Sequence, residues 1–495
     1  MNFFESIRKA VRNLFHHTKL EAALGIEISV SSKMEDSIDL WTKMFQDEPP
    51  WKNEEAGQET LGLPNSIASE IARLTTVEMV SVVTGSPRAD YINEQYKKVV
   101  TKARNYTEFA AGMGGIAMKP YVSGTKIPVS IVYAEDFYPT SFDSDGDIRG
   151  ACFIDYAYDE KYRYTRVEEH GFDDNGMYFV RNKCFRQQIS DIAIGDEKLG
   201  DEVPLTEVPD WADVSEYVPV GNIERPLFSY FKMPFANNVE PKSPLGVAAY
   251  SRAINLIKKA DRLWSEILWE YDGGELAVNA STNLFQKDIT GKPIIPEGRE
   301  RMFKETFDFD DENFLQTYNP QFRDSSLFNG LNKTEQRIEF QCGLAYGTIS
   351  DPNMVDKTAT EINAAKQRSY STIHDTQAAL EKALRDLVYA IDAIATLYNL
   401  APAGSYEVTF QWDDSIIVDA EQERLRDREE VRDGLMQKWE YRVKWYGETP
   451  EKAKQMIADA EESGISDDEI LDFLDEPSAD EGSEGKGAKE PKKEG

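Results

Sequence analysis

The feature that most constrains the fold is a very long helical pattern in the second half of the chain. It runs from Thr358 to Leu400, about 40 residues, with Thr358 and Thr360 as candidate capping residues. A helix of this length exceeds what is typical of a globular domain. Directly before and across its start stands SDPNMVDKTATEI, whose first part is rich in Asp, Pro and Asn. Since another helical pattern precedes it, the chain must change direction here between two helices.

Other parts of the chain alternate between helical and strand-like patterns. The expected segments, in chain order, are helices over 61–115, antiparallel strands over 116–220, a helix over 243–274, short strands over 275–326, a helix over 328–349 and charged helix over 420–473. Turns at Asp145-Gly146 and Asn175-Gly176 support hairpins in the strand-rich part. A chain of 495 residues with 40% hydrophobic side chains can build two to four packed modules. The sequence therefore predicts an α+β protein.

The helix predicted over 243–274 has a well-defined start and an apolar stripe. Ser243 is the expected N-cap, Pro244 stands at the first helical position, and two glycines end the pattern. The stripe consists of Val247, Tyr250, Ile254, Ile257, Trp264, Leu268 and Tyr271. Such a helix would be roughly 45 Å long. No strong helix follows it directly, so we expect neighbouring copies of the chain to cover the stripe.

Several kinds of chemistry are missing from the sequence. There is no phosphate-binding loop of the GxxxxGK[ST] type and no HExxH motif, so we expect no enzyme, no cofactor and no metal site. The three cysteines, Cys152, Cys184 and Cys342, lack metal-ligand spacing. The stretch DSDGD (143–147) is expected to be a hairpin turn rather than a calcium loop. The stretch DFDDEN (308–313) is expected to be a solvated acidic loop.

The charge distribution limits the partners. A formal net charge of −33 argues against a protein that grips nucleic acid, because tight binding to a duplex relies on Lys and Arg displacing counterions. The first 20 residues predict a short amphipathic helix, and no run of 18 apolar residues predicts a membrane span. We therefore expect a soluble protein, cytoplasmic when it is made. The acidic tail over 475–495 has nothing to bury and is expected to be disordered and dispensable for assembly.

Four stretches, taken in order, resemble the portal proteins of tailed bacteriophages, of the type found in long-tailed phages and prophages of Gram-positive hosts. They are AAGMGGIAMKPYV, AEDFYPTSFDSDGDIRGACFID, AINLIKKADRLWSEILWEYDGG and GLAYGTISDPNMVDKTATEI. The resemblance spans about 61–400, and the run KTATE is its most specific part. It implies the portal fold, with wing, stem, clip and crown regions, in a ring of twelve subunits around an axial channel at one capsid vertex.

Carried onto this chain, the resemblance implies an assignment of every region. The regions are a wing (1–242), a first stem helix (243–274), a clip (275–327), a second stem helix (328–349), a tunnel loop (350–357), a long wing helix and strand (358–419), a crown (420–474) and the tail (475–495). The DNA-facing residues of the tunnel loop would be Met354, Val355, Asp356 and Lys357. An acidic lumen suits a channel through which a polyanion must slide, because each contact between a phosphate and a lysine would have to be broken repeatedly.

The resemblance also implies binding partners, and two other functions remain as alternatives to a portal. Duplex DNA would pass through the ring during packaging and ejection, and a terminase, a head-tail adaptor, the major capsid protein and scaffolding protein would bind it, with assembly in the host cytoplasm and residence in the virion. Overproduced protein could form rings of thirteen. One alternative is another ring-shaped head-tail connector. A metal-dependent nuclease using DFDDEN with Glu300 or Glu305 is a second.

Overall fold

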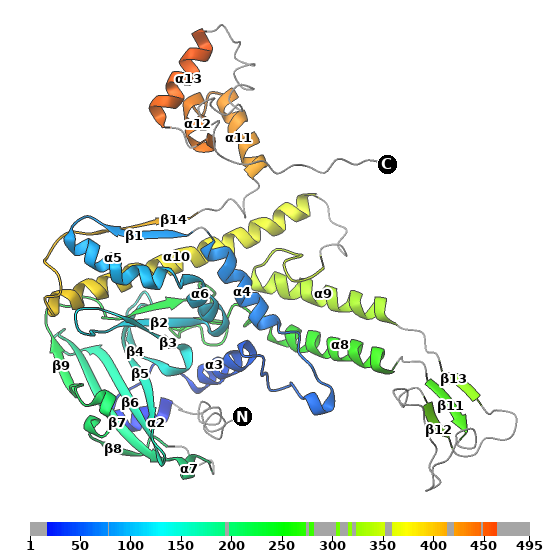
Figure 1. The fold of residues 1–495 in the computed structure, drawn as a ribbon, viewed down its shortest axis with the longest axis horizontal. Helices are drawn as coiled ribbons and strands as arrows, with labels where there is room; N and C mark the ends of the chain where they lie inside the picture. The colour runs from blue at the N-terminus through cyan, green and yellow to red at the C-terminus, as the bar shows by residue number, and fades with distance from the viewer. Residues whose placement is uncertain are drawn as a thin grey trace. The chain divides into compact units, whose positions relative to one another are not determined.

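The computed structural model describes residues 17–77, 79–193, 198–273, 277–281, 303–306, 315–318, 323–351, 359–412, 420–446 and 449–462. The chain divides into two compact units, residues 1–413 and residues 414–495 (Figure 1). The N-terminal helix predicted within residues 1–20 lies mostly outside the described residues. The acidic stretch 308–313 and the tail 475–495 lie entirely outside them.

The described residues of the first unit include nine α-helices. They are α2 (His17–Leu24), α3 (Ser32–Phe45), α4 (Leu63–Thr76), α5 (Pro87–Val100), α6 (Ala103–Met113), α7 (Ile189–Ala193), α8 (Ile254–Gly273), α9 (Asp324–Cys342) and α10 (Ala359–Leu397). The residue just before the first turn determines where several of these helices begin. Ser31 caps α3, since its hydroxyl accepts a hydrogen bond from the amide of Met34 at 3.3 Å. Ser86 caps α5 by accepting from the amide of Ala89 at 3.4 Å.

The predicted antiparallel region is confirmed. Strands β4 (Phe137–Phe142), β5 (Ile148–Tyr158), β6 (Tyr162–Phe172), β7 (Tyr178–Gln188) and β8 (Asp201–Val203) form one sheet in that order, and β9 (Tyr217–Val220) also pairs with β7. Strands β10 (Ser229–Lys232), β2 (Gly115–Pro120) and β3 (Val129–Tyr133) form a second sheet. Both predicted turns connect neighbouring strands, and Gly146 and Gly176 adopt φ values of 82° and 77° there. Thus the alternating pattern did predict this part of the fold.

A buried ionic cluster joins the two sheets. Glu168 of β6 accepts from Lys119 of β2 at 2.7 Å, and its other oxygen lies 2.7 Å from Nε2 of His170. Burial opposes ionisation of Glu168, but Lys119 and His170 outweigh it and hold the pKa of this carboxyl well below its usual value. Burial lowers the pKa of His170, which sits among Phe153 and Phe228. His170 is thus a structural core residue.

The long helix α10 runs through the first unit and contacts α4, α5, β2 and β10 (Figure 1). Its buried side chains include Leu384, Leu387, Val388 and Ile391. The predicted pattern over 358–400 is therefore confirmed as a single helix. Strand β14 (Glu407–Gln411) follows it and pairs with β1 (Val80–Thr84) in a two-stranded antiparallel ribbon.

The predicted start of the helix over 243–274 is wrong. Residues 243–253 form turns, and α8 begins at Ile254, not at Ser243. The reason is tertiary: a Cβ atom on Gly246 would lie 2.1 Å from the carbonyl oxygen of Gly114, so the two backbones touch. The amide of Ala249 donates to Ala111, and the hydroxyl of Tyr250 donates to the carbonyl oxygens of Trp41 and Gly112 at 3.0 and 2.7 Å. These contacts take the place of a first helical turn.

Helix α9 runs beside α8 and also differs from its predicted bounds (Figure 1). It ends at Cys342, not at Ile349, because Gly343 adopts a left-handed conformation with φ 74° and the amide of Leu344 donates to the carbonyl of Glu339 at 2.9 Å. Between the two helices, β11 (Ala277–Ser281), β12 (Phe303–Thr306) and β13 (Leu315–Tyr318) form a small sheet in the order β12-β11-β13. The short strands expected over 275–326 are confirmed.

In the second unit, the described residues form three short helices, α11 (Ala420–Arg432), α12 (Lys438–Tyr446) and α13 (Pro450–Glu462). Their small core consists of Val431, Tyr441 and Ile457. The charged helical pattern predicted there is confirmed for these segments. Among the described helices of the whole chain, none is long and apolar enough to cross a membrane.

The buried guanidinium of Arg88 provides a test of this packing. It donates to the carboxylate of Asp392 at 2.7 Å, to the carbonyl of Ala401 at 2.9 Å, and to Thr396, and it is 1% exposed. We expect Arg88→Met to lower the free energy of unfolding by about 2–4 kcal/mol, because the charge-assisted bond to Asp392 and the bonds to Ala401 and Thr396 are lost together. Chemical denaturation measures the change. Arg73→Met is the control, since Arg73 forms a surface pair with Glu70 worth less than about 1 kcal/mol. Equal effects of the two variants would contradict the expectation.

Candidate functional site

The helix pair α8 and α9 is the candidate site, because the predicted interface and the predicted tunnel loop both adjoin it. At the far end of the pair, the guanidinium of Arg323 makes a two-pronged ion pair with Glu270, at 2.7 and 3.2 Å. The hydrogen bond from Arg323 lowers the pKa of Glu270. This ion pair ties the end of α8 to the start of α9.

The predicted apolar stripe divides into two parts. Val247, Tyr250 and Ile257 have no exposed surface, so the chain itself covers them. Ile254, Trp264 and Leu268 are half-buried, and Tyr271 is 44% exposed. The inference that the stripe lacks a partner within the chain was therefore wrong for its first part, which other segments of the chain cover.

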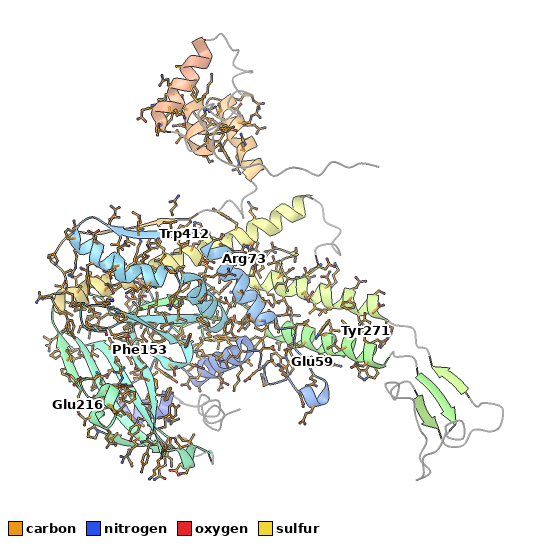
Figure 2. The ribbon with its side chains drawn as sticks, in the orientation of Figure 1. Glu59, Arg73, Phe153, Glu216, Tyr271 and Trp412 are labelled. Atoms are coloured by element: carbon orange, nitrogen blue, oxygen red, sulfur yellow. The ribbon has the colours of Figure 1, made fainter. Side chains whose placement is uncertain are left out.

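The exposed apolar surface of α8 lies at the end of this helix, where Trp269 is 70% exposed. Sequence reasoning missed this residue because it lies off the predicted stripe. Next to it is a hollow of about 1060 Å³ between α8 and the loop 51–59, lined by side chains that include Trp51, Leu268 and Tyr271. Figure 2 shows Glu59 on this loop and Tyr271 near the end of α8. An exposed Trp and Tyr beside a hollow are typical of a contact surface.

The loop 51–61 is fastened to α8 by the carboxylate of Asp261. One oxygen accepts from the indole of Trp51 at 2.8 Å and the other from the amide of Leu61 at 3.0 Å. Burial raises the pKa of Asp261, which is 3% exposed. Ser265 adds a bond from the amide of Glu59 at 3.0 Å. The loop is thus held on one face of α8, while Trp269 and Tyr271 at the end of the helix stay exposed.

The chain that follows α9 wraps around the carboxylate of Glu339. This side chain has no exposed surface, and it accepts hydrogen bonds from the amides of Gly347, Ile349 and Ser350 and from the hydroxyl of Ser350. The amide of Asp351 donates to Asn332 of α9 at 2.9 Å. Residues 347–351 are therefore fixed to α9 up to the point where the described chain stops.

The predicted tunnel-loop residues Met354, Val355, Asp356 and Lys357 lie outside the described residues. The turn 143–147 is confirmed as a hairpin turn, since Asp143 accepts from the amides of Asp145 and Asp147 at 3.1 and 2.9 Å. Within the described ranges, no group of three or more His, Cys, Asp or Glu side chains could hold a metal ion.

Comparison with known proteins identifies the class. Residues 52–459, which include α8, α9 and α10, match the family described as "Phage portal protein, SPP1 Gp6-like". Because this match covers most of the sequence, the chain belongs to that family of phage portal proteins. Its role is that of a portal protein of a phage, and the family is structural rather than enzymatic.

Two further comparisons complete this result. No curated protein matches the chain. A solved structure described as "Neck of native GTA particle computed with C12 symmetry" is similar at 10% sequence identity and a TM-score of 0.40, over 86% of this chain and 98% of that chain.

The carboxyl of Glu335 gives the site a measurable pH dependence. Burial, together with the nearby charge of Glu339, raises its pKa from 4.5 to about 7. The folded chain therefore binds more protons than the unfolded chain between these values, and stability falls as pH rises from about 4.5 to 7. We expect Glu335→Gln to remove this fall and to raise the free energy of unfolding at pH 8 by about 1–3 kcal/mol.

Denaturation at pH 5, 6, 7 and 8 checks this expectation. Glu407→Gln is the matched control, because Glu407 is an exposed glutamate on β14. The control should follow the wild-type curve. A Glu335→Gln curve parallel to the wild-type curve at all four values would contradict the assigned pKa of Glu335.

Proposed function

We propose that this portal protein forms a closed ring of twelve subunits, or thirteen when overproduced away from capsids, at one capsid vertex. The match to the portal family over residues 52–459 carries the proposal. In it, residues 1–242 and 358–419 form the wing, 243–274 and 328–349 the stem, 275–327 the clip and 420–474 the crown. The hairpin of α8 and α9 supports the stem assignment, since it joins two helices that flank a small sheet.

The exposed end of α8 is the surface we assign to contacts between stems. Trp269 and Tyr271 are large apolar side chains that water covers in a single chain, and Trp and Tyr carry much of the energy in protein interfaces. Of the predicted stripe, Trp264, Leu268 and Tyr271 remain candidates, and Trp269 is added. Val247, Tyr250 and Ile257 instead hold the stem to the wing, because the chain buries them completely.

Residues Met354 to Lys357 are proposed to face duplex DNA as it passes through the ring. The net charge of −33 supports a channel with few fixed cations, which lets a polyanion slide. The stretch follows directly on residues 347–351, which are fixed to α9. Terminase, a head-tail adaptor, the major capsid protein and scaffolding protein are the proposed partners, with assembly in the host cytoplasm.

Native mass spectrometry tests the ring. We expect a species with twelve or thirteen times the mass of the chain, and we expect Trp269→Ser to weaken each contact between subunits by about 2 kcal/mol, so that rings dissociate at micromolar concentration. Tyr398→Ser is the control, since Tyr398 is 60% exposed but lies outside the stem. A wild-type protein that stays monomeric would overturn the ring, and intact Trp269→Ser rings would overturn the assigned contact surface.

DNA packaging into proheads tests the DNA-facing role. Asp356→Lys would add one cation per subunit around the ring and create a salt-sensitive brake on the phosphates. We expect rings of normal mass with packaging reduced at least several-fold at low salt and partly restored at higher salt. Asp356→Asn, which removes a charge but adds no cation, should package close to the wild-type level. Undiminished packaging by Asp356→Lys at every salt concentration would mean that this stretch does not meet DNA.

A further inference from the structure

Burial of the Glu339 carboxylate requires other groups to compensate for its lost contact with water. This carboxylate lies in the last turn of α9 with no exposed surface, and removing an ionised carboxylate from water is costly unless other groups compensate it. In the part of the chain that the structure describes, no lysine, arginine or histidine forms an ion pair with it. The compensation must come from hydrogen bonds.

Four donors supply those bonds, and all of them come from the short segment that follows α9. The amide of Gly347 lies 3.1 and 3.2 Å from the two carboxylate oxygens. The amides of Ile349 and Ser350 donate to one oxygen at 2.7 and 2.9 Å, and the hydroxyl of Ser350 donates to the other at 2.9 Å. Hydrogen bonds to an ionised acceptor are the stronger kind. One side-chain charge therefore determines the conformation of residues 347–350.

Other contacts keep this segment between α9 and α10. The amide of Asp351 is held by Asn332, which is 5% exposed. On the α10 side, the guanidinium of Arg368 lies 4.2 Å from the ring of Phe340 and 5.8 Å from that of Tyr346. A Cβ atom on Gly343 would meet the hydroxyl of Thr372 at 2.3 Å, so the start of the segment also lies against α10.

We propose that Glu339 is a positioning residue for DNA passage, acting through residues 347–351. By holding these residues on α9, its charge sets the direction in which the chain leaves the stem. This inference rests on the proposed function, in which Met354 to Lys357 face DNA. Glu339 itself does not touch DNA, because it is fully buried.

The carboxylate of Glu339 accepts several hydrogen bonds at once, so a change of this one group alters all of them. Glu339→Gln keeps the size of the side chain but replaces one acceptor oxygen with a donor, which then opposes the amides that point toward it. Ser350→Ala removes one donor and leaves the carboxylate in place. The matched control is Glu407→Gln, because Glu407 is an exposed glutamate on β14, away from residues 347–351.

Hydrogen exchange measured by mass spectrometry on assembled rings gives the structural readout. We expect Glu339→Gln to speed exchange in peptides covering 347–351 by at least about tenfold, as the loss of a charge-assisted hydrogen bond implies. Ser350→Ala should give a smaller increase in the same peptides, and Glu407→Gln should give none. Unchanged exchange over 347–351 in both Glu339→Gln and Ser350→Ala would overturn the inference, and Ser350→Ala decides alone if Glu339→Gln does not fold.

DNA packaging into proheads gives the functional readout. Rings of Glu339→Gln with normal mass should package at least several-fold less DNA than wild type, while Glu407→Gln rings should package normally. If Asp356→Lys reduces packaging but Glu339→Gln, with its faster exchange, does not, the positioning role is overturned and the DNA-facing role stands. If neither variant reduces packaging, the DNA-facing role itself fails.

Discussion

The close backbone contact between Gly114 and Gly246 is the constraint on which the rest of the structure depends. It places the turns at 243–253 against α6 and β2, and it leaves no space for a side chain at either position. Tyr250 then reaches the carbonyls of Trp41 in α3 and Gly112 in α6, so three separate segments of the chain meet at one hydroxyl. Because α8 begins directly after these contacts, they fix where this helix starts.

Two buried glutamates illustrate two ways of keeping a charge inside the protein. Glu168 is surrounded by Lys119, Arg166 and His170, and it fastens two sheets together through charged side chains. Glu339 has main-chain amides and one hydroxyl instead, all from its own chain segment. The second arrangement fixes the conformation of the short segment that follows α9.

The chain's acidity and its local cations have separate roles. The net charge of the chain is −33, yet several cations among the described residues of the first unit are paired individually, as with Arg88 and Asp392 or Lys119 and Glu168. Such pairs hold together elements that are far apart in the sequence.

The sequence by itself determined the order of elements, the hairpin turns at Gly146 and Gly176, the single long helix α10 and the portal family. These depend on local periodicity, on glycines that allow positive φ and on a specific run of residues, all of which are readable in one dimension. Only the tertiary structure decided that α8 starts at Ile254, that Val247 and Tyr250 are buried, and that Glu339 holds residues 347–350. Each of these outcomes depends on a contact with a distant segment or on hydrogen bonds from backbone amides. Neither kind of interaction leaves a signal in the pattern of residue types.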